Sequence, residues 1–214
     1  EICACLVGSE MCIRDRDIHL PNGDIYIKKH MDGVIFAGEV DIRVIEEFRK
    51  QSIPVVLVNN YLDMDGLVCI SADHYGGAVQ ATEYLCKLGH CKIGLLSGRF
   101  SPQVSEARIE GFVKTLAKYD IPVDDRFIAD IEPALEDGEE IMTRMLRGVD
   151  RPTAFFCTND TIAAGAMKAV TRAGLRVPED IAIIGFDDSY ISRVVEPELT
   201  TVRIDAAKTV SYTH

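Results

Sequence analysis

Polar side chains follow two apolar runs in the second half of the chain. Asn159 and Asp160 come after the run 153–157, and Asp187 comes after the run 181–185. If both runs are strands of one open parallel sheet, these side chains share a crevice wall, because ligands bind beyond the carboxyl ends of such strands. Carboxylate and amide groups suit a hydroxyl-rich small molecule better than a phosphate. The spacing therefore predicts a binding site for a polyol-like ligand.

The elements that would position these groups alternate along the chain. Short apolar runs predict buried strands, and apolar residues at intervals of three and four predict amphipathic helices between them. The predicted strands are 32–38, 53–58, 67–70, 92–98, 127–129, 153–157, 181–185 and 197–204, the last including a turn. The predicted helices are 42–50, 75–88, 101–119, 136–146, 159–173 and 191–195. This alternation indicates an α/β fold with parallel sheets.

The composition limits the possible classes of function. The chain has 214 residues and a formal net charge of -11, and it has no cluster of basic residues that would bind a nucleic-acid backbone directly. No apolar run reaches the ~20 residues needed to cross a bilayer, and the start lacks the basic lead of a secretory signal. The 7 cysteines lack the spacing of a disulfide framework or a zinc site. We expect a reducing, cytoplasmic setting and neither metal nor cofactor.

Common catalytic and nucleotide-binding motifs are absent from the sequence. It contains no Gly-x-Gly-x-x-Gly turn after a strand, no Gly-x-x-x-x-Gly-Lys-Ser/Thr loop and no Gly-x-Ser-x-Gly elbow. The histidines are scattered, and none has an obvious nucleophile beside it in the sequence. Catalytic groups can still meet in space, but nothing in the sequence favours an enzyme, and we expect none.

Both ends of the chain differ from the rest. Residues 1–16 follow neither a helical nor a strand period. Together with residues 210–214, they resemble the translation of sequencing-adapter remnants. We therefore expect a native fragment from about residue 17 to about residue 209, with both true ends missing. The alternative is a genuine N-terminal arm, which would pack as a hydrogen-bonded strand of the core.

Several short motifs, each weak by itself, occur in a fixed order. They are Asp73 with Gly76-Gly77, Leu-Gly-His at 88–90, Arg-Ile-Glu-Gly-Phe at 108–112, Pro-Thr-Ala at 152–154 leading to Asn159-Asp160, Gly-Leu-Arg-Val-Pro-Glu-Asp-Ile at 174–181, Gly-Phe-Asp-Asp at 185–188 and Pro-Glu-Leu-Thr-Thr-Val at 197–202. Together they resemble the effector-binding domain of LacI/GalR-type transcriptional regulators. The resemblance covers about residues 33–205.

This resemblance implies a periplasmic-binding-protein-like fold of type I, in which two parallel-sheet α/β subdomains enclose a ligand cleft and are joined by hinge crossovers. The incomplete N-terminal subdomain would comprise residues 17–73 and 199–209, and the C-terminal subdomain residues 74–198. The resemblance also implies a homodimer that binds operator DNA through an N-terminal helix-turn-helix. We find no such domain before residue 32, as expected of a truncated fragment.

The resemblance assigns four residues to the ligand site. Arg108 matches the arginine that reaches the effector, where a guanidinium can hold two hydroxyls or a carboxylate. Asn159 and Asp160 match a pair that follows a strand, although Asn159 would also cap a helix well. Asp187 matches a hydroxyl acceptor. The structural alternatives are a surface position for Arg108 and a turn-forming role for Asp187. On the binding interpretation, Arg108→Ala abolishes the effector response and leaves the fold intact.

Two further positions, Asp73 and Phe156, have two interpretations each. Asp73, at the crossover, either faces the cleft or forms a turn. Phe156 points either into the sheet core or over the ligand ring, because the sequence does not fix which strand residues face which side. His74 stands where asparagine is common, so a ligand contact at this position is in doubt.

Two functions follow from these observations. The first is a sensor domain that binds a small molecule, with a sugar favoured over a purine or nucleoside, and controls operator binding. The alternative is a sugar-binding protein of a transport system, which shares the fold and needs an export signal. The motifs at 174–188 and 199–201 resemble the regulators more.

Overall fold

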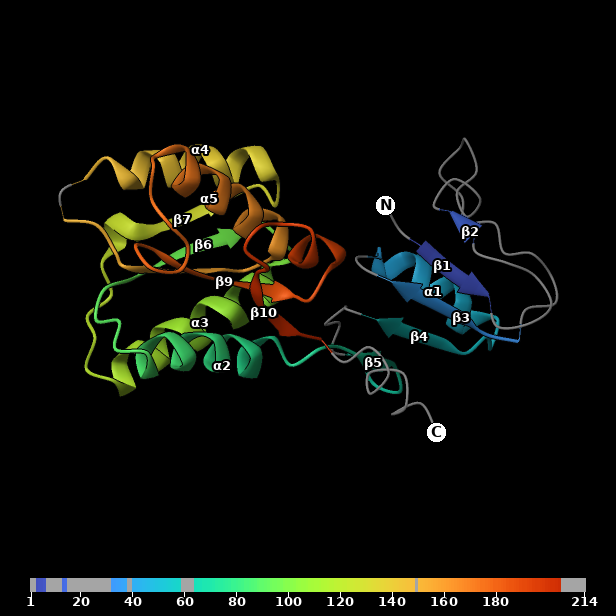
Figure 1. The fold of residues 1–214 in the computed structure, drawn as a ribbon. Helices are drawn as coiled ribbons and strands as arrows, with labels where there is room; N and C mark the ends of the chain where they lie inside the picture. The colour runs from blue at the N-terminus through green and yellow to red at the C-terminus, as the bar shows by residue number, and fades with distance from the viewer. Residues whose placement is uncertain are drawn as a thin grey trace. The chain divides into compact units, whose positions relative to one another are not determined.

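The computed structural model describes residues 3–6, 13–14, 32–37, 40–58, 64–148 and 150–204. These residues form two compact units. The first contains the described residues up to Ala72, and the second is Asp73–Ile204 (Figure 1). Each unit has its own sheet and its own apolar core. No helix in these described ranges is both long and apolar enough to cross a membrane.

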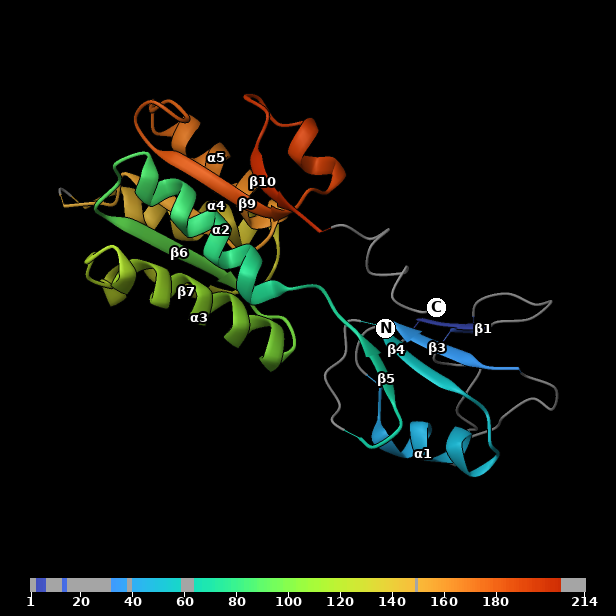
Figure 2. The same ribbon diagram turned by 90° about the horizontal axis from the view of Figure 1, so that it is seen from below.

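The second unit is a parallel sheet covered by helices on both faces. Its strands are ordered β10-β9-β8-β6-β7. Their bounds are β6 Ile93–Gly98, β7 Ile128–Ile131, β8 Ala154–Cys157, β9 Ala182–Asp187 and β10 Thr200–Arg203. One face is covered by α2 (His74–Lys87) and α3 (Pro102–Lys118), and the other by α4 (Leu135–Leu146) and α5 (Asp160–Arg172), as Figures 1 and 2 show. The 3-10 turn η2 (Asp125–Phe127) precedes β7, and the 3-10 turn η3 (Tyr190–Arg193) follows β9.

An apolar core lies on each face of this sheet. Strands β6 and β8 are buried along their whole length, as expected of parallel strands covered on both sides. Successive residues of β8 point to opposite faces. Phe155 joins the core under α4 and α5 with Ile162, whereas Phe156 joins the core under α2 and α3 with Phe112. The two-sided core explains why the strand sequences are continuous apolar runs.

Helices α4 and α5 approach each other closely at two glycines. A Cβ atom added to Gly165 would lie 2.1 Å from the carbonyl oxygen of Leu135, and one added to Gly138 would lie 2.5 Å from that of Ile162. These distances leave no space for a methyl group between the two backbones. The glycines therefore set how closely the helices pack.

The first unit contains a mixed sheet in the order β2-β1-β3-β4-β5. Its parallel strands are β3 Val34–Ala37, β4 Val55–Val58 and β5 Val68–Ile70, and helix α1 spans Ile42–Lys50. Phe36 and Phe48 meet edge to face in the core with a centroid distance of 5.5 Å. The prediction of parallel strands alternating with helices is therefore confirmed for the middle of this unit and for the whole second unit.

Residues 1–16, which follow neither a helical nor a strand period, contain two short strands. Strand β1 (Cys3–Leu6) pairs antiparallel with β3, and β2 (Ile13–Arg14) pairs antiparallel with β1. β1 has 4 residues and β2 has 2, which is too short for a period of apolar side chains to be recognised. The pairing of β1 with β3 is the hydrogen bonding that the alternative, a genuine N-terminal arm, requires. The foreign origin of residues 1–16 stays a prediction, and residues 210–214 lie outside the described part of the chain.

The last strand also differs from its expected place. Residues 199–209 were assigned to the first subdomain, but β10 pairs in parallel with β9, and the second unit extends to Ile204. Residues 199–204 therefore belong with the second unit, because their hydrogen-bonding partner is there. Residues 205–209 lie outside the described residues.

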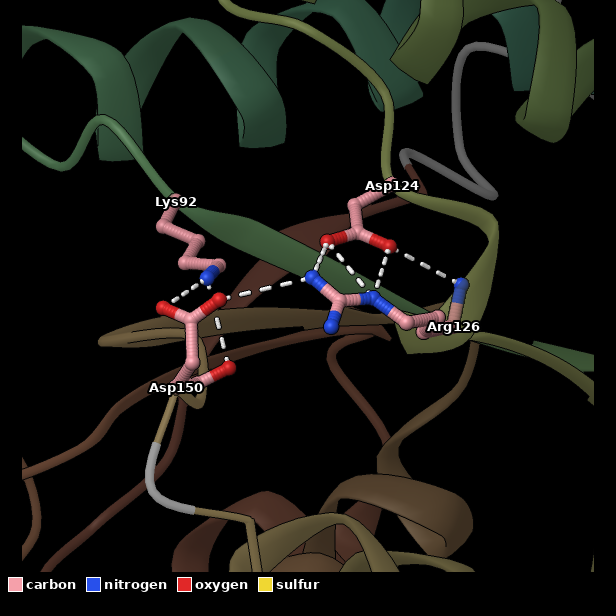
Figure 3. Close-up of polar contacts among 4 residues, drawn as sticks. All are labelled: Lys92, Asp124, Arg126 and Asp150. Carbon is pink, nitrogen blue, oxygen red and sulfur yellow. Dashed lines mark hydrogen bonds and ion pairs between the residues drawn. The ribbon is translucent and has the colours of Figure 1, made fainter.

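An ion-pair cluster joins the starts of three strands in the second unit (Figure 3). Arg126 donates from Nε and Nη2 to the Asp124 carboxylate at 2.9 and 2.6 Å, and its Nη2 lies 3.4 Å from Asp150. Lys92 forms an ion pair with Asp150 and donates to its carbonyl oxygen at 3.2 Å. The hydrogen bond from Arg126 is the main reason that the pKa of Asp124 falls to about 2. The cluster lies before β6, β7 and β8, at the edge of the sheet opposite their carboxyl ends.

Candidate functional site

Arg108 lies at the centre of the polar groups near the carboxyl ends of β8 and β9. It projects from α3, and its side chain is only 4% exposed, so it is not the surface arginine of the alternative interpretation. Its Nη1 donates to the carbonyl oxygen of Thr158, directly after β8. Its Nη2 donates to Asp187 Oδ1, at the end of β9, at 3.2 Å, and also lies 3.2 Å from His74 Nδ1. The guanidinium is thus held from three elements.

Two aromatic rings lie close to the same guanidinium. Its Cζ atom lies 4.1 Å from the centroid of Phe186 and 4.9 Å from that of Phe100. A cation over an aromatic ring is attracted by the negative face of the ring, and more strongly where water is excluded. The sequence did not identify either ring as part of this site. The available signal for Phe186 was its place directly before the predicted site residue Asp187.

Asp187 is the most exposed member of this group. Its side chain is 34% exposed, and its backbone φ of 104° is in the left-handed region, which directs the chain sharply away from β9. Burial raises the pKa of Asp187 to about 6, against the lowering effect of Arg108 and with a further rise from the Asp160 carboxylate. A carboxylate that is partly exposed and held by an arginine can accept hydrogen bonds from hydroxyl groups of a ligand.

Asp160 holds three segments together at the start of α5. It is 1% exposed, accepts from the backbone N–H of Ser189 at 2.6 Å and accepts from the hydroxyl of Thr201 at 2.5 Å. Gly185 provides the space for this carboxylate, because a Cβ atom there would lie 2.4 Å from Asp160 Oδ1. Both of its oxygens are therefore engaged by protein groups. The ligand contact predicted for Asp160 stays a prediction, and its structural role is now the better-supported one.

Asn159 and Asp73 both cap helices. Asn159 Oδ1 accepts from the backbone N–H of Ile162 at 2.8 Å, at the start of α5. Asp73 Oδ1 accepts from the backbone N–H of Gly76 at 2.7 Å, at the start of α2. A cap satisfies an N–H group that has no partner within the helix. Asn159 can cap through its oxygen and still offer its amide N–H groups to a ligand.

Phe156 lies in the core and not at the surface of a binding site. It is 0% exposed and packs between Phe112 and Phe186, with ring centroids 6.4 and 6.3 Å away. The structure therefore supports the core interpretation of Phe156. Its influence on the site is indirect, because Phe186 is the ring that contacts the guanidinium of Arg108.

The predicted residues thus separate into groups. Arg108 and Asp187 are in direct contact, and Asp160 lies near enough to Asp187 to raise its pKa. Asp73 and Phe156 contribute a helix cap and core packing. His74, whose ligand contact was in doubt, is buried beside Arg108. In the described ranges, no group of three or more histidine, cysteine, aspartate or glutamate side chains is arranged to hold a metal ion.

Comparison with known proteins gives consistent matches. The periplasmic binding protein-like domain family matches residues 82–212. The probable HTH-type transcriptional repressor ExuR of Bacillus subtilis is 35% identical over 186 residues, which cover 86% of this chain and 56% of ExuR. The HTH-type transcriptional repressor PurR of Actinobacillus pleuropneumoniae is 38% identical over 182 residues, which cover 84% and 54%.

Solved structures match in the same way. A LacI family transcriptional regulator from Enterococcus faecium, solved with bound ribose, superposes with a TM-score of 0.72 at 31% identity. The superposition covers 79% of this chain and 64% of that one. The chain spans about half the length of the curated relatives it matches.

Proposed function

Since the chain belongs to the periplasmic binding protein-like domain family and resembles its LacI-type transcriptional regulators throughout, we propose that it is the effector-binding part of such a regulator. In this role it binds a small molecule and changes the affinity of the whole protein for operator DNA. The DNA contact, a homodimeric assembly and a cytoplasmic location are parts of the same proposal. They concern a longer protein, in keeping with relatives that are named HTH-type repressors.

The observation that carries this proposal is the contact between Arg108 and Asp187. Parallel sheets of this kind bind ligands beyond the carboxyl ends of their strands, and Asp187 ends β9 at that edge. Arg108 fixes one carboxylate oxygen of Asp187, which leaves the carboxylate oriented toward a ligand through its exposed part. Groups that are oriented before binding lose less conformational entropy when the ligand arrives.

A sugar is the ligand class that these groups favour. Carboxylate and amide groups can accept from and donate to the paired hydroxyls of a sugar ring, and Asp187 and Asn159 provide one of each. The positive charge of Arg108 is already paired with Asp187, so the ligand does not need a negative charge of its own. The ribose bound by the similar regulator from Enterococcus faecium supports the same class.

Regulation requires that the ligand distinguish two states of the protein. A ligand shifts an equilibrium only by its difference in affinity for the two states. We expect the effector to favour one arrangement of the chain and thereby change operator affinity. Catalysis has no part in this proposal.

A calorimetric and thermal-shift screen tests the ligand class. The wild-type chain would be measured against monosaccharides, disaccharides and nucleobases, with Asp187→Asn as the site variant and Glu179→Gln, at an exposed position, as the matched control. We expect at least one sugar to stabilise the wild type and the control equally, and Asp187→Asn much less. Stabilisation by a nucleobase alone would contradict the sugar assignment. A folded chain that none of these compounds stabilises would contradict the sensor proposal.

A further inference from the structure

His74 is the first residue of α2 and lies inside the second unit. It is 5% exposed, and the Asp73 cap fixes the backbone just before it. Its ring lies 6.1 Å from that of Phe186 between centroids, at an interplanar angle of 36°. Phe186 also covers the guanidinium of Arg108. The imidazole and the guanidinium therefore lie against the same aromatic ring.

The polar contact between His74 and Arg108 fixes the tautomer of the histidine. An arginine guanidinium has only donors, so His74 Nδ1, 3.2 Å from Arg108 Nη2, must be the acceptor. A ring nitrogen that accepts carries no proton. The neutral ring must then carry its proton on Nε2.

Burial and the charge of Arg108 keep the imidazole neutral. The pKa of His74 is lowered to about 4, first by burial and then by the nearby positive charge of Arg108, against the raising effect of Asp73. The other charged groups of this cluster are Asp187 on β9, which is paired with Arg108, and Asp160 on α5. Arg108 thus has a neutral acceptor on one side and a carboxylate on the other at ordinary pH.

Each hydrogen of Arg108 Nη2 therefore has its own acceptor. One points to His74 Nδ1 and the other to Asp187 Oδ1, both at 3.2 Å. Without the histidine, the guanidinium keeps Asp187 and the carbonyl oxygen of Thr158 as acceptors but loses the one that His74 offers to Nη2. A guanidinium with fewer acceptors rotates more easily, and the carboxylate paired with it loses its fixed orientation.

We propose that His74 is a positioning residue, which holds Arg108 through its unprotonated Nδ1 and so orients the Arg108–Asp187 pair. Its importance for a ligand rests on the proposed function, but the contact itself does not. This role explains why histidine can stand where asparagine is common. The Oδ1 atom of asparagine occupies nearly the same place relative to the backbone as Nδ1 of histidine, so both side chains can present an acceptor to Arg108.

Nitrogen NMR of the whole chain without ligand tests the tautomer. The ring signals of His74, assigned by their loss in His74→Asn, should show a protonated Nε2 and an unprotonated Nδ1 at pH 7. This pattern should persist to pH 5, because the pKa of His74 lies near 4. A protonated Nδ1 at pH 7 would overturn the proposal, whether or not any sugar binds.

Three variants test the positioning role. His74→Asn keeps an acceptor in the place of Nδ1, His74→Gln moves it to the place of Nε2, and His74→Leu removes it. We expect the Nη signals of Arg108, identified by their loss in Arg108→Lys, to stay separate in the wild type and His74→Asn and to merge through rotation in the other two. Equal signals in the Asn and Gln variants would overturn the proposal. The comparison of His74→Asn with His74→Gln remains decisive even if His74→Leu does not fold.

Discussion

Arg108 Nη2 and Asp187 Oδ1 lie 3.2 Å apart although 79 residues separate the two in the chain. One partner is nearly inaccessible to solvent, and the other is about one-third exposed. The pair thus joins the inside of the second unit to the surface at the end of β9. A change at either residue therefore affects both the stability of the fold and the surface offered to a ligand.

Arg108→Ala should reduce stability as well as the effector response. The sequence alone suggested an intact fold. In the structure the guanidinium is buried close to two rings and donates hydrogen bonds to the carbonyl oxygen of Thr158 and to the carboxylate of Asp187. Leaving a buried acceptor such as the Thr158 carbonyl oxygen without its donor typically costs about 1–3 kcal/mol. Chemical denaturation should show this loss for Arg108→Ala and almost none for Arg147→Ala, at an exposed position. Equal stability of the two variants would show that Arg108 is not structurally important.

Asp187 should make the stability of the chain depend on pH in an unusual direction. Its pKa is raised from 3.8 to about 6, so between these values the folded chain holds a proton that the unfolded chain has released. This contribution to stability is therefore largest at low pH, falls as pH rises toward 6 and is constant above it.

The measurement is a set of unfolding free energies between pH 4 and pH 7 for the wild type and Asp187→Asn. The asparagine variant lacks this titration, so the wild type should lose stability relative to it as pH rises. A difference between the two proteins that does not change with pH would be evidence against a raised pKa.

The ion-pair cluster of Figure 3 should control one carboxyl pKa without much effect on folding. Arg126→Gln should raise the pKa of Asp124 from about 2 toward the ordinary 3.8, because the Arg126 side-chain hydrogen bond is the largest cause of the lowering. Lys92→Gln is the matched control and should change it least, since Lys92 is the weakest cause. Carbon NMR of the Asp124 carboxyl group measures both. A larger change in the pKa of Asp124 in Lys92→Gln than in Arg126→Gln would contradict this prediction.

Gly165→Ala should destabilise the second unit by forcing α4 and α5 apart. The new methyl group would lie 2.1 Å from the Leu135 carbonyl oxygen, and overpacking of this kind costs about 1–3 kcal/mol. Gly148→Ala is the control, because a Cβ atom there meets its nearest neighbour only at 3.8 Å. Thermal unfolding should separate the two. If both variants melt like the wild type, the helices can move apart without cost.

The fold was largely predictable because its strands and helices carry strong apolar patterns. The run 153–157 ends where β8 ends, and the run 181–185 ends two residues before the end of β9, so the positions of Asn159 and Asp187 at the sheet edge followed from the sequence. The family resemblance was confirmed by comparison with known proteins. Strand β1 was missed because its 4 residues are too few to show a period of apolar side chains.

The site was less predictable, because its contacts join residues far apart in the chain. The sequence could not predict which face of the sheet Phe156 points to, because β8 is buried on both faces and has no polar residues that would mark one of them. His74 and Phe100 reach Arg108 only through the packing of α2 and α3 against the sheet. The ligand roles of Arg108, Asn159, Asp160 and Asp187 stay predictions until a ligand is bound.

The two hydrogen bonds that Asp160 accepts link the ligand-facing edge proposed for the second unit to its last strand. Its carboxylate joins the first turn of α5 to the segment after β9 through Ser189 and to β10 through Thr201, and β10 is the last strand before the second unit ends at Ile204. Ser189, two residues beyond Asp187, is therefore linked through one carboxylate to the strand by which the chain leaves the unit.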